Sequence, residues 1–221
     1  MKMHGLGNDF VVVDARAQPV ALSDTLIRAL ADRHRGVGFD QLAVISDGTD
    51  LTITFYNADG SQSAACGNAT RCIAAREMAR RGVDALSIDV TGRGMLRAVQ
   101  TPDGGTAVNM GHPQTAWQDI PLAHDVDTLA LPIGGGPVAT GMGNPHCTFF
   151  VDDVLAIDLA TRGAQMEHHP LYPERTNVQF AQIIGPDHIR MRVWERGTGI
   201  TLSLIHISEP TRQYCQSRMP S

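Results

Sequence analysis

Cysteines, basic residues and long apolar runs are all scarce in this chain of 221 residues. Its four cysteines are too few for a disulfide scaffold of this size, so we expect reduced thiols. The 18 lysines and arginines are outnumbered by 23 aspartates and glutamates, and the net charge of -5 disfavours a nucleic-acid-binding surface. No apolar run approaches the length of a membrane span, and no signal peptide is visible. These absences predict a cytoplasmic protein without a membrane or nucleic-acid partner.

The apolar pattern of the first half predicts a mixture of strands and helices. Hydrophobic residues make up 43% of the chain, enough for one large domain or two small ones. Ser23 is the expected capping residue in front of leucines and an isoleucine at helical spacing, and we expect Gly36 and Gly38 to end that helix after residue 35. Short apolar or alternating runs predict strands at residues 10–13, 42–45 and 51–55.

A segment of small and apolar residues from Ala64 to Ala79 predicts a helix that is buried on nearly all sides. Arginines gather toward its end, before Gly82, where positive charge suits the helix dipole. Cys66 is therefore expected at the N-terminus of a central, buried helix.

The second half of the chain repeats the order of these features. A glycine-asparagine pair, Gly7-Asn8 and then Gly143-Asn144, precedes an apolar strand in each half. The alternating strand that ends at Asn57 is matched by one that runs into Glu195. The sequence predicts two related halves, with a boundary in the Pro/Gly-rich stretch at residues 111–113.

Cys66 is open to several interpretations. A zinc site is disfavoured, because zinc ligands come in closely spaced pairs, whereas Cys66 and Cys72 are six positions apart and Cys147 is isolated. A buried cysteine is commonly a small hydrophobe in a core. The position favours a reactive thiol, because a helix N-terminus lowers a thiol pKa from about 8.5 toward ~3.5–7.5. The N–H groups of Gly67 and Asn68 suit a carboxylate, so proton transfer at the carbon beside that carboxylate is a suitable task for this thiol.

Asparagines stand at several strand ends and turns, and any single one is typical of a turn. The matching contexts of Asn8 and Asn144 weaken that explanation for these two. Glu195-Arg196 follows a predicted strand, where the pair suits an ammonium group and a carboxylate respectively. A solvated surface pair is the alternative.

Five segments together resemble diaminopimelate epimerases in their order and spacing. They are KMHGLGNDF at residues 2–10, YNADGS at 56–61, CGN at 66–68, MGNPHC at 142–147 and WERGTG at 194–199. The resemblance, which covers residue 1 to about residue 202, implies an α/β (α+β) fold of two pseudo-symmetric domains, each a mostly antiparallel sheet wrapped around a central helix. It also implies conversion of LL-diaminopimelate to meso-diaminopimelate, for lysine and peptidoglycan synthesis, without pyridoxal phosphate, metal or another cofactor.

The same resemblance implies roles for individual residues. Two cysteines act on opposite faces of the α-carbon, one as thiolate and the other as thiol, and Cys66 matches one of them. Cys72 and Cys147 match no catalytic residue and are expected in the core. His146 matches a histidine that supports activity. The residues that match substrate contacts are Asn8, Gln41, Asn57, Gly67, Asn68, Asn144, Asn177, Glu195 and Arg196.

The chain departs from the family pattern at the second cysteine. Cys66 lies nine positions after Asn57, but the ninth position after Glu195 is Leu204. Cys215 lies eleven positions later in a polar context and is not expected to replace the missing thiol. Since the reaction needs two acid/base groups, we expect this chain not to epimerise, although Cys66 would still support exchange of the α-proton from one side.

The last segment of the chain has a different character from the rest. Residues 202–213, LSLIHISEPTRQ, resemble translated sequencing-adapter read-through, and we interpret residues 203–221 as a non-native tail. The expected domains are an N-terminal epimerase half at residues 1–112 and an incomplete C-terminal half at residues 113–202 that lacks its central helix.

Three other functions stay open. Proline racemase-like or phenazine-biosynthesis-like isomerases are disfavoured by Asn57, Asn177 and Glu195-Arg196, which suit a substrate with two amino-acid ends. A non-catalytic protein would keep a diaminopimelate pocket without the second thiol. A fragment with no function of its own is the third. The sequence indicates no oligomeric state, and a homodimer stays open.

Overall fold

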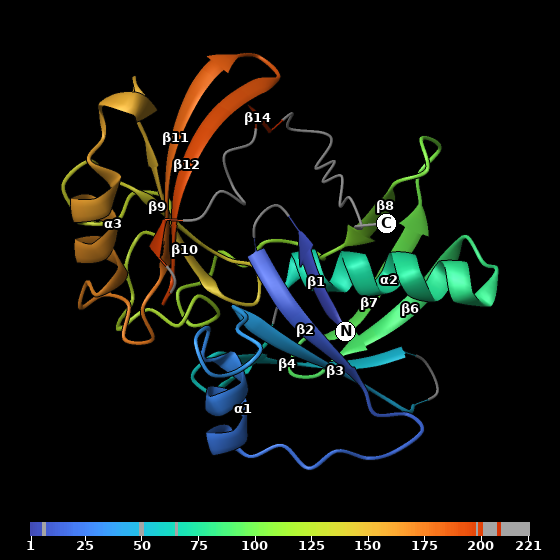
Figure 1. Cartoon of the computed structure of the whole chain (residues 1–221). Coiled ribbons are helices and arrows are strands. Elements are labelled where there is room, and N and C mark those ends of the chain that lie inside the picture. Colours follow the sequence, from blue (N-terminus) through green and yellow to red (C-terminus); the bar gives the residue numbers. More distant parts are fainter. Residues whose placement is uncertain (6–7, 49–50, 65, 198, 201–206, 209–221) are drawn as a thin grey trace. The chain divides into compact units, whose positions relative to one another are not determined.

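The computed structural model describes residues 1–5, 8–48, 51–64, 66–197, 199–200 and 207–208. The chain forms two compact units, one that contains Met1–Met110 and one at Gly111–Gln213. Each unit combines a sheet with helices (Figure 1). Within the described ranges, no helix is long and apolar enough to cross a membrane.

The first unit contains an eight-stranded sheet with the strand order β1-β2-β3-β4-β6-β7-β8, and β5 pairs with β4. Neighbouring strands are antiparallel except for the pairs β2–β3 and β4–β6. The three strands expected from the sequence are confirmed within β2, β3 and β4. The strands are β1 (Lys2–Gly5), β2 (Asn8–Asp14), β3 (Gln41–Ser46), β4 (Leu51–Asn57), β5 (Gln62–Ser63), β6 (Ala85–Val90), β7 (Gly94–Gln100) and β8 (Thr106–Asn109).

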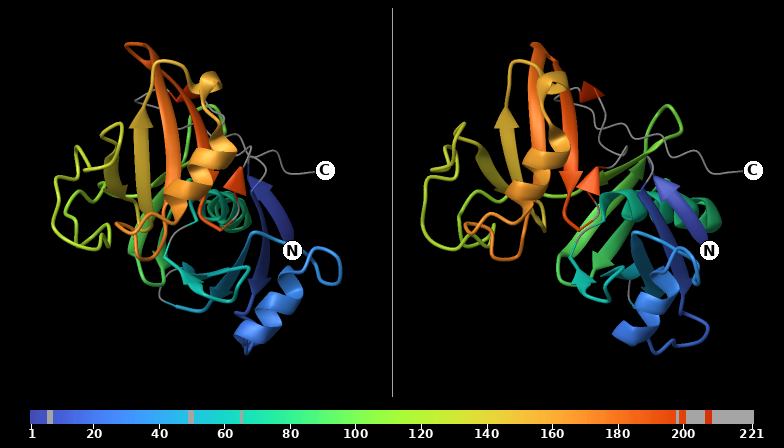
Figure 2. Two further views of the ribbon diagram at one scale, coloured as in Figure 1. Left: turned by 90° about the vertical axis from the view of Figure 1, so that its left-hand side faces the viewer. Right: turned by 60° about the vertical axis from the view of Figure 1, so that its left-hand side comes forward.

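The strands of the first sheet surround helix α2 (Gly67–Arg81), which is seen end-on in the left view of Figure 2. Ala69, Ile73 and Ala74 of α2 share one buried cluster with residues of β2, β3, β4, β6 and β7. Small side chains let the helix approach the strands closely, and Gly82 in the left-handed conformation ends it. The predicted buried helix is confirmed, with Cys66 as its N-cap and Gly67 as its first helical residue.

Helix α1 (Asp24–Ala31) packs on the other face of this sheet through a separate cluster that includes Ile27 and Leu42. Ser23 is its N-cap, as expected, and its hydroxyl accepts the N–H of Leu26 at 3.2 Å. The expected end after residue 35 is wrong.

The helix ends at Ala31 because the next residue, Asp32, starts a turn. One carboxylate oxygen of Asp32 accepts the N–H groups of His34 at 2.8 Å and of Arg35 at 3.0 Å. Gly36 follows this turn, and a Cβ at Gly36 would lie 2.3 Å from the carbonyl oxygen of Ala29.

The second unit contains a six-stranded sheet with the order β13-β12-β11-β10-β9, and β14 pairs with β12. Helix α3 packs against β11, β12 and β13 (Figure 1). Its buried cluster includes Leu159 and Met166 of α3 with Val178 and Phe180 of β11. The elements are β9 (Val138–Gly141), β10 (Pro145–Phe150), the 3-10 helix η1 (Val154–Ala156), α3 (Leu159–Glu167), β11 (Asn177–Gly185), β12 (His188–Glu195), β13 (Gly199–Ile200) and β14 (Ile207–Ser208).

The two sheets share one pairing pattern. The successive pairs β1–β2, β2–β3, β3–β4 and β4–β5 are antiparallel, parallel, antiparallel and antiparallel. The pairs β9–β10, β10–β11, β11–β12 and β12–β13 follow the same series. A helix joins the parallel pair of this series in each unit, α1 between β2 and β3 and α3 between β10 and β11. The predicted pseudo-symmetric, mostly antiparallel architecture is therefore confirmed, while Leu204, Cys215 and the region that would repeat α2 lie outside the described residues.

Candidate active site

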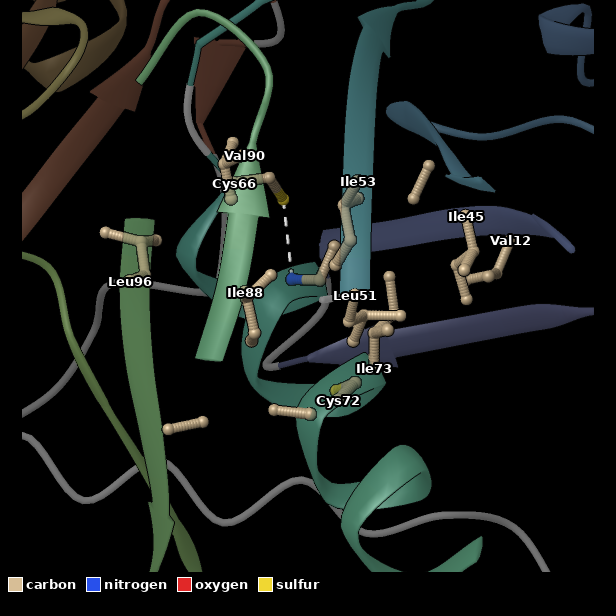
Figure 3. Close-up of a cluster of buried hydrophobic side chains, with 14 of the residues drawn as sticks. Val12, Ile45, Leu51, Ile53, Cys66, Cys72, Ile73, Ile88, Val90 and Leu96 are labelled. Atoms are coloured by element: carbon tan, nitrogen blue, oxygen red, sulfur yellow. Dashed lines mark hydrogen bonds between the residues drawn. The ribbon is translucent and has the colours of Figure 1, made fainter. Parts of the chain in front are cut away.

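Cys66 is the N-cap residue of α2 and is only 7% exposed. Its Sγ atom accepts the N–H of Ala69 at 3.4 Å, the bond that is dashed in Figure 3. Its carbonyl oxygen accepts the N–H of Thr70 at 2.9 Å and the Thr70 hydroxyl at 2.8 Å. The thiol thus takes the capping place usually filled by serine, threonine or aspartate, at the positive end of the helix dipole.

The side chain of Asn8 connects this thiol to a carboxylate. The Cys66 thiol donates to Asn8 Oδ1 over 3.9 Å, and Asn8 Nδ2 donates to Asp40 Oδ2 at 3.3 Å. Asp40 also accepts the N–H of Asp9 at 3.0 Å and pairs with Arg33 at 2.6 Å. The pKa of Asp40 is raised, and the largest cause is desolvation by burial. The sequence analysis missed Asp40, which orients the Asn8 amide with its oxygen toward the thiol.

Gln41 and Asn57 lie opposite each other on β3 and β4. Gln41 Nε2 donates to Asn57 Oδ1 and to the hydroxyl of Ser63, each at 3.4 Å. Asn57 Nδ2 donates to the hydroxyl of Ser61 at 3.0 Å. The two serines were not expected here, although both precede the Cys-Gly-Asn segment in the sequence.

Strand direction brings Asn8, Gln41 and Asn57 to one end of the sheet. Strands β2 and β3 are parallel, so both begin at this end, whereas β4 is antiparallel to β3 and finishes there. The structure therefore assembles these three amides and Cys66 at the start of α2.

Gly67 and Asn68 begin the helix. No described residue would lie within 4 Å of a Cβ built at Gly67, the first helical residue. Asn68 Oδ1 accepts a hydrogen bond from Arg71 at 2.9 Å, and a Cβ at Gly5 would lie 3.1 Å from Asn68 Cβ. Glycine at position 5 therefore lets β1 approach the first turn of α2.

The second unit gathers a similar set of residues where β10 and β11 begin and β12 ends. Asn177 Nδ2 donates to the carbonyl of Pro145 at 3.1 Å, and Asn177 Oδ1 accepts the N–H of Arg196 at 3.0 Å. The Arg196 guanidinium donates to the carbonyl of Glu174 at 3.1 Å. These bonds tie Glu195-Arg196 to the start of β11.

Glu167 is a further residue that the sequence analysis missed. It ends α3, is 3% exposed and accepts the indole N–H of Trp194 at 2.6 Å and the N–H of Gly197 at 2.9 Å. These two hydrogen bonds, one from the residue before Glu195-Arg196 and one from the residue after, hold that turn against α3. A charged residue at the end of a partly apolar helix was the available signal.

His146 is half-buried and lies between two amides. Its Nε2 lies 2.9 Å from Asn144 Oδ1, and its Nδ1 lies 2.7 Å from Gln179 Nε2. Burial, followed by the positive charge of Arg196, lowers the pKa of His146 to about 4. The ring is therefore neutral at pH 7.

The other two described cysteines belong to the cores, as expected. Cys72 is 3% exposed within the cluster around α2, and Cys147 is fully buried in the cluster of the second unit. Burial raises the pKa of Cys147 to about 12, although a hydrogen bond with Tyr172 acts in the opposite direction. Across the described ranges, no group of three potential metal ligands lies close enough to hold a metal ion.

The fold is one found in amino-acid epimerases and racemases. A hydroxyproline epimerase from Agrobacterium vitis, with bound trans-4-hydroxy-L-proline, matches with a TM-score of 0.62 at 14% identity, covering 91% of this chain and 71% of that chain. A probable proline racemase from Agrobacterium radiobacter K84 matches with a TM-score of 0.60 at 14% identity, covering 92% and 72%. At this identity the likeness concerns the fold alone.

Sequence comparison defines the family. The profile of diaminopimelate epimerases matches residues 1–116 and 138–203. The diaminopimelate epimerases of Rhodospirillum centenum (strain ATCC 51521 / SW) and Acidiphilium cryptum (strain JF-5) are both 51% identical to this chain over 209 residues. These matches cover 91% and 92% of this chain and 72% and 75% of the two relatives. The chain belongs to the diaminopimelate epimerase family, a family of amino-acid epimerases.

Proposed function

We propose that this chain binds diaminopimelate and that Cys66 exchanges a proton with its α-carbon, as one member of the two-cysteine acid/base pair of the family reaction. The observation that carries the proposal is the setting of the thiol. Cys66 Sγ accepts a helix N-terminal N–H at 3.4 Å and lies 3.9 Å from the oriented amide oxygen of Asn8. A helix N-terminus favours the thiolate, the form that removes a proton.

The proposed proton transfer is balanced at the thiol. As the α-carbon–hydrogen bond breaks, a sulfur–hydrogen bond forms on Cys66, and the electron pair passes toward the adjacent carboxylate. The start of α2 at Gly67 and Asn68 is proposed to hold that carboxylate, because helix N-terminal N–H groups stabilise developing negative charge. No described residue fills the space beside Gly67, and this supports the assignment.

The proposed substrate contacts supply polar groups for a molecule with two amino-acid ends. The first unit offers Asn8, Gln41 and Asn57, and the second offers Asn144, Asn177 and Glu195-Arg196, with His146 as a supporting residue. A site that hydrogen-bonds both ends rejects analogues that lack one of them. We further propose that residues 1–112 and 113–202 are the two epimerase halves and that the product serves lysine and peptidoglycan synthesis in the cytoplasm.

This chain is proposed to exchange the α-proton without inverting the carbon. Inversion requires removal of the proton on one face and its return on the other, and Leu204 stands where the second thiol is expected. A Cys66 thiol that exchanges its hydrogen with deuterated water would return deuterium to the face from which the proton left. A diaminopimelate-binding protein without any exchange, or a fragment without function, is the alternative.

The test is incubation of the full chain with LL- and with meso-diaminopimelate, separately, in deuterated water. Proton NMR and mass spectrometry follow deuterium at the α-carbon, and chiral chromatography follows the isomer. We expect incorporation with retained configuration, loss of incorporation in Cys66→Ala, and normal incorporation in Cys72→Ala. Cys72 is the matched control because it is a buried cysteine of the same helix.

Each other outcome has a definite meaning. Conversion of one isomer to the other refutes the proposal of one-sided exchange. Binding without incorporation, measured by calorimetry, favours the binding-protein alternative. Neither binding nor incorporation by a folded chain refutes the proposed function.

A further inference from the structure

Gln179 is a buried polar residue within an otherwise apolar stretch of β11. It is 5% exposed, and its neighbours Val178 and Phe180 point into the cluster beneath α3. Alternation along the strand directs Gln179 to the opposite face of the sheet. Burying an amide is costly unless its hydrogen bonds are made, so the hydrogen-bond partners of Gln179 indicate its structural role.

In the structure the amide of Gln179 turns its oxygen toward Thr148 and its nitrogen toward His146. The hydroxyl of Thr148 donates to Gln179 Oε1 at 3.3 Å, and Gln179 Nε2 lies 2.7 Å from His146 Nδ1. An amide nitrogen donates and does not accept, so Nδ1 of His146 must be the unprotonated nitrogen.

The unprotonated Nδ1 determines the direction of the next hydrogen bond, between His146 and Asn144. Because His146 is neutral and Nδ1 accepts, the single ring proton is on Nε2. Nε2 then donates to Asn144 Oδ1 at 2.9 Å, which turns the NH2 group of Asn144 away from the ring. Asn144 is thereby presented as a donor.

We propose that Gln179 is a positioning residue, which selects the Nε2–H tautomer of His146 and thereby presents the Asn144 amide as a hydrogen-bond donor to a carboxylate of the substrate. The part that concerns the substrate rests on the proposed function. The part that concerns the tautomer rests on the three hydrogen bonds alone. Gln179 has no expected contact with substrate and acts through His146.

The first measurement is the tautomer of His146, read from long-range nitrogen–proton NMR correlations in the full chain at pH 7. The His146 signals are assigned by their absence in His146→Asn. The parent chain is expected to carry the proton on Nε2. Gln179→Glu replaces the donor by a carboxylate, which accepts from Nδ1–H, so the proton is expected on Nδ1. Gln179→Met keeps the length without a donor, and a mixture of tautomers is expected.

Gln182→Glu is the matched control, because it makes the same change on the same strand away from His146. Gln182 Oε1 lies 3.5 Å from the N–H of Val154, in another part of the unit. The control should keep the parent tautomer. A parent chain with the proton on Nδ1, or a Gln179→Glu chain that keeps it on Nε2, would overturn the proposal. If Gln179→Glu does not fold, the parent and Gln179→Met decide it.

The second measurement is the affinity for diaminopimelate by calorimetry. Loss of a charge-assisted hydrogen bond from Asn144 is expected to weaken binding about tenfold to hundredfold in Gln179→Glu, and not in Gln182→Glu. A changed tautomer with unchanged affinity would overturn the role toward the substrate. If the parent chain does not bind diaminopimelate, the proposed function fails, while the NMR result still decides whether Gln179 sets the tautomer.

Discussion

Replacing the buried Glu77 by glutamine is expected to destabilise the first unit strongly and in a pH-dependent way. Glu77 lies in α2, has no exposed side-chain surface and is surrounded by arginines. Arg16 contacts its carboxylate at 2.9 Å, Arg80 at 2.8 Å and Arg81 at 3.5 Å. The variant keeps the shape of the side chain but leaves several positive charges around a neutral group.

The size of the effect follows from the pKa of Glu77. Desolvation raises this pKa, but the hydrogen bonds from Arg16 and Arg80 outweigh it and lower the value from 4.5 to about 2. Since one pKa unit corresponds to about 1.4 kcal/mol, ionised Glu77 contributes about 3 kcal/mol to the free energy of unfolding. Because the pKa is lowered on folding, this contribution is complete above pH 4.5 and disappears as the pH falls toward 2.

The assay is urea unfolding of the parent, Glu77→Gln and Asp84→Asn, followed by circular dichroism at several pH values. Asp84 is the control because it is an exposed carboxylate in the same unit. We expect Glu77→Gln to lose about 3 kcal/mol at pH 7 and less than half of that at pH 3, and Asp84→Asn to change little at either pH. A loss below about 0.5 kcal/mol at pH 7, or an equal loss at both pH values, would refute the assigned role of the arginine cluster.

Two further predictions concern the second unit. Cys147 is fully buried with a pKa raised to about 12, so mass spectrometry should find it alkylated at pH 8 only after unfolding; equal labelling of native and urea-treated chain would contradict its place in the core. Gly163→Ala places a Cβ 2.6 Å from Trp194 Cβ, so we expect a loss of about 1–3 kcal/mol in urea unfolding. Gly134→Ala, where a Cβ meets none of the described residues within 4 Å, should change stability by less than about 0.5 kcal/mol.

Local features were the most predictable part of the fold. The strand at β2, the cap at Ser23 and the buried helix with Cys66 at its start all depend on neighbours a few residues away. The predicted end of α1 was wrong because the sequence contains two competing signals for a helix end. Gly36 is a common helix terminator, but Asp32 acts earlier by accepting the N–H groups of the next turn.

Buried charged and polar residues were the least predictable part. Glu77 resembles an ordinary helix residue in the sequence, and its importance depends on Arg16, which is 61 positions away. Gln179 similarly depends on His146, which is 33 positions away. A polar residue inside an apolar run is a visible signal, but its partner is not.

The sequence by itself determined the family, because short segments in a fixed order identify it, and it determined that a thiol begins the central helix of the first unit. The tertiary structure decided which polar groups meet. Asn8, Gln41 and Asn57 share one end of a sheet because β2 and β3 are parallel and β4 is antiparallel, and strand direction is a property of the whole sheet. Hydrogen bonds between distant residues form only after these strands pair, so no local pattern in the chain encodes them.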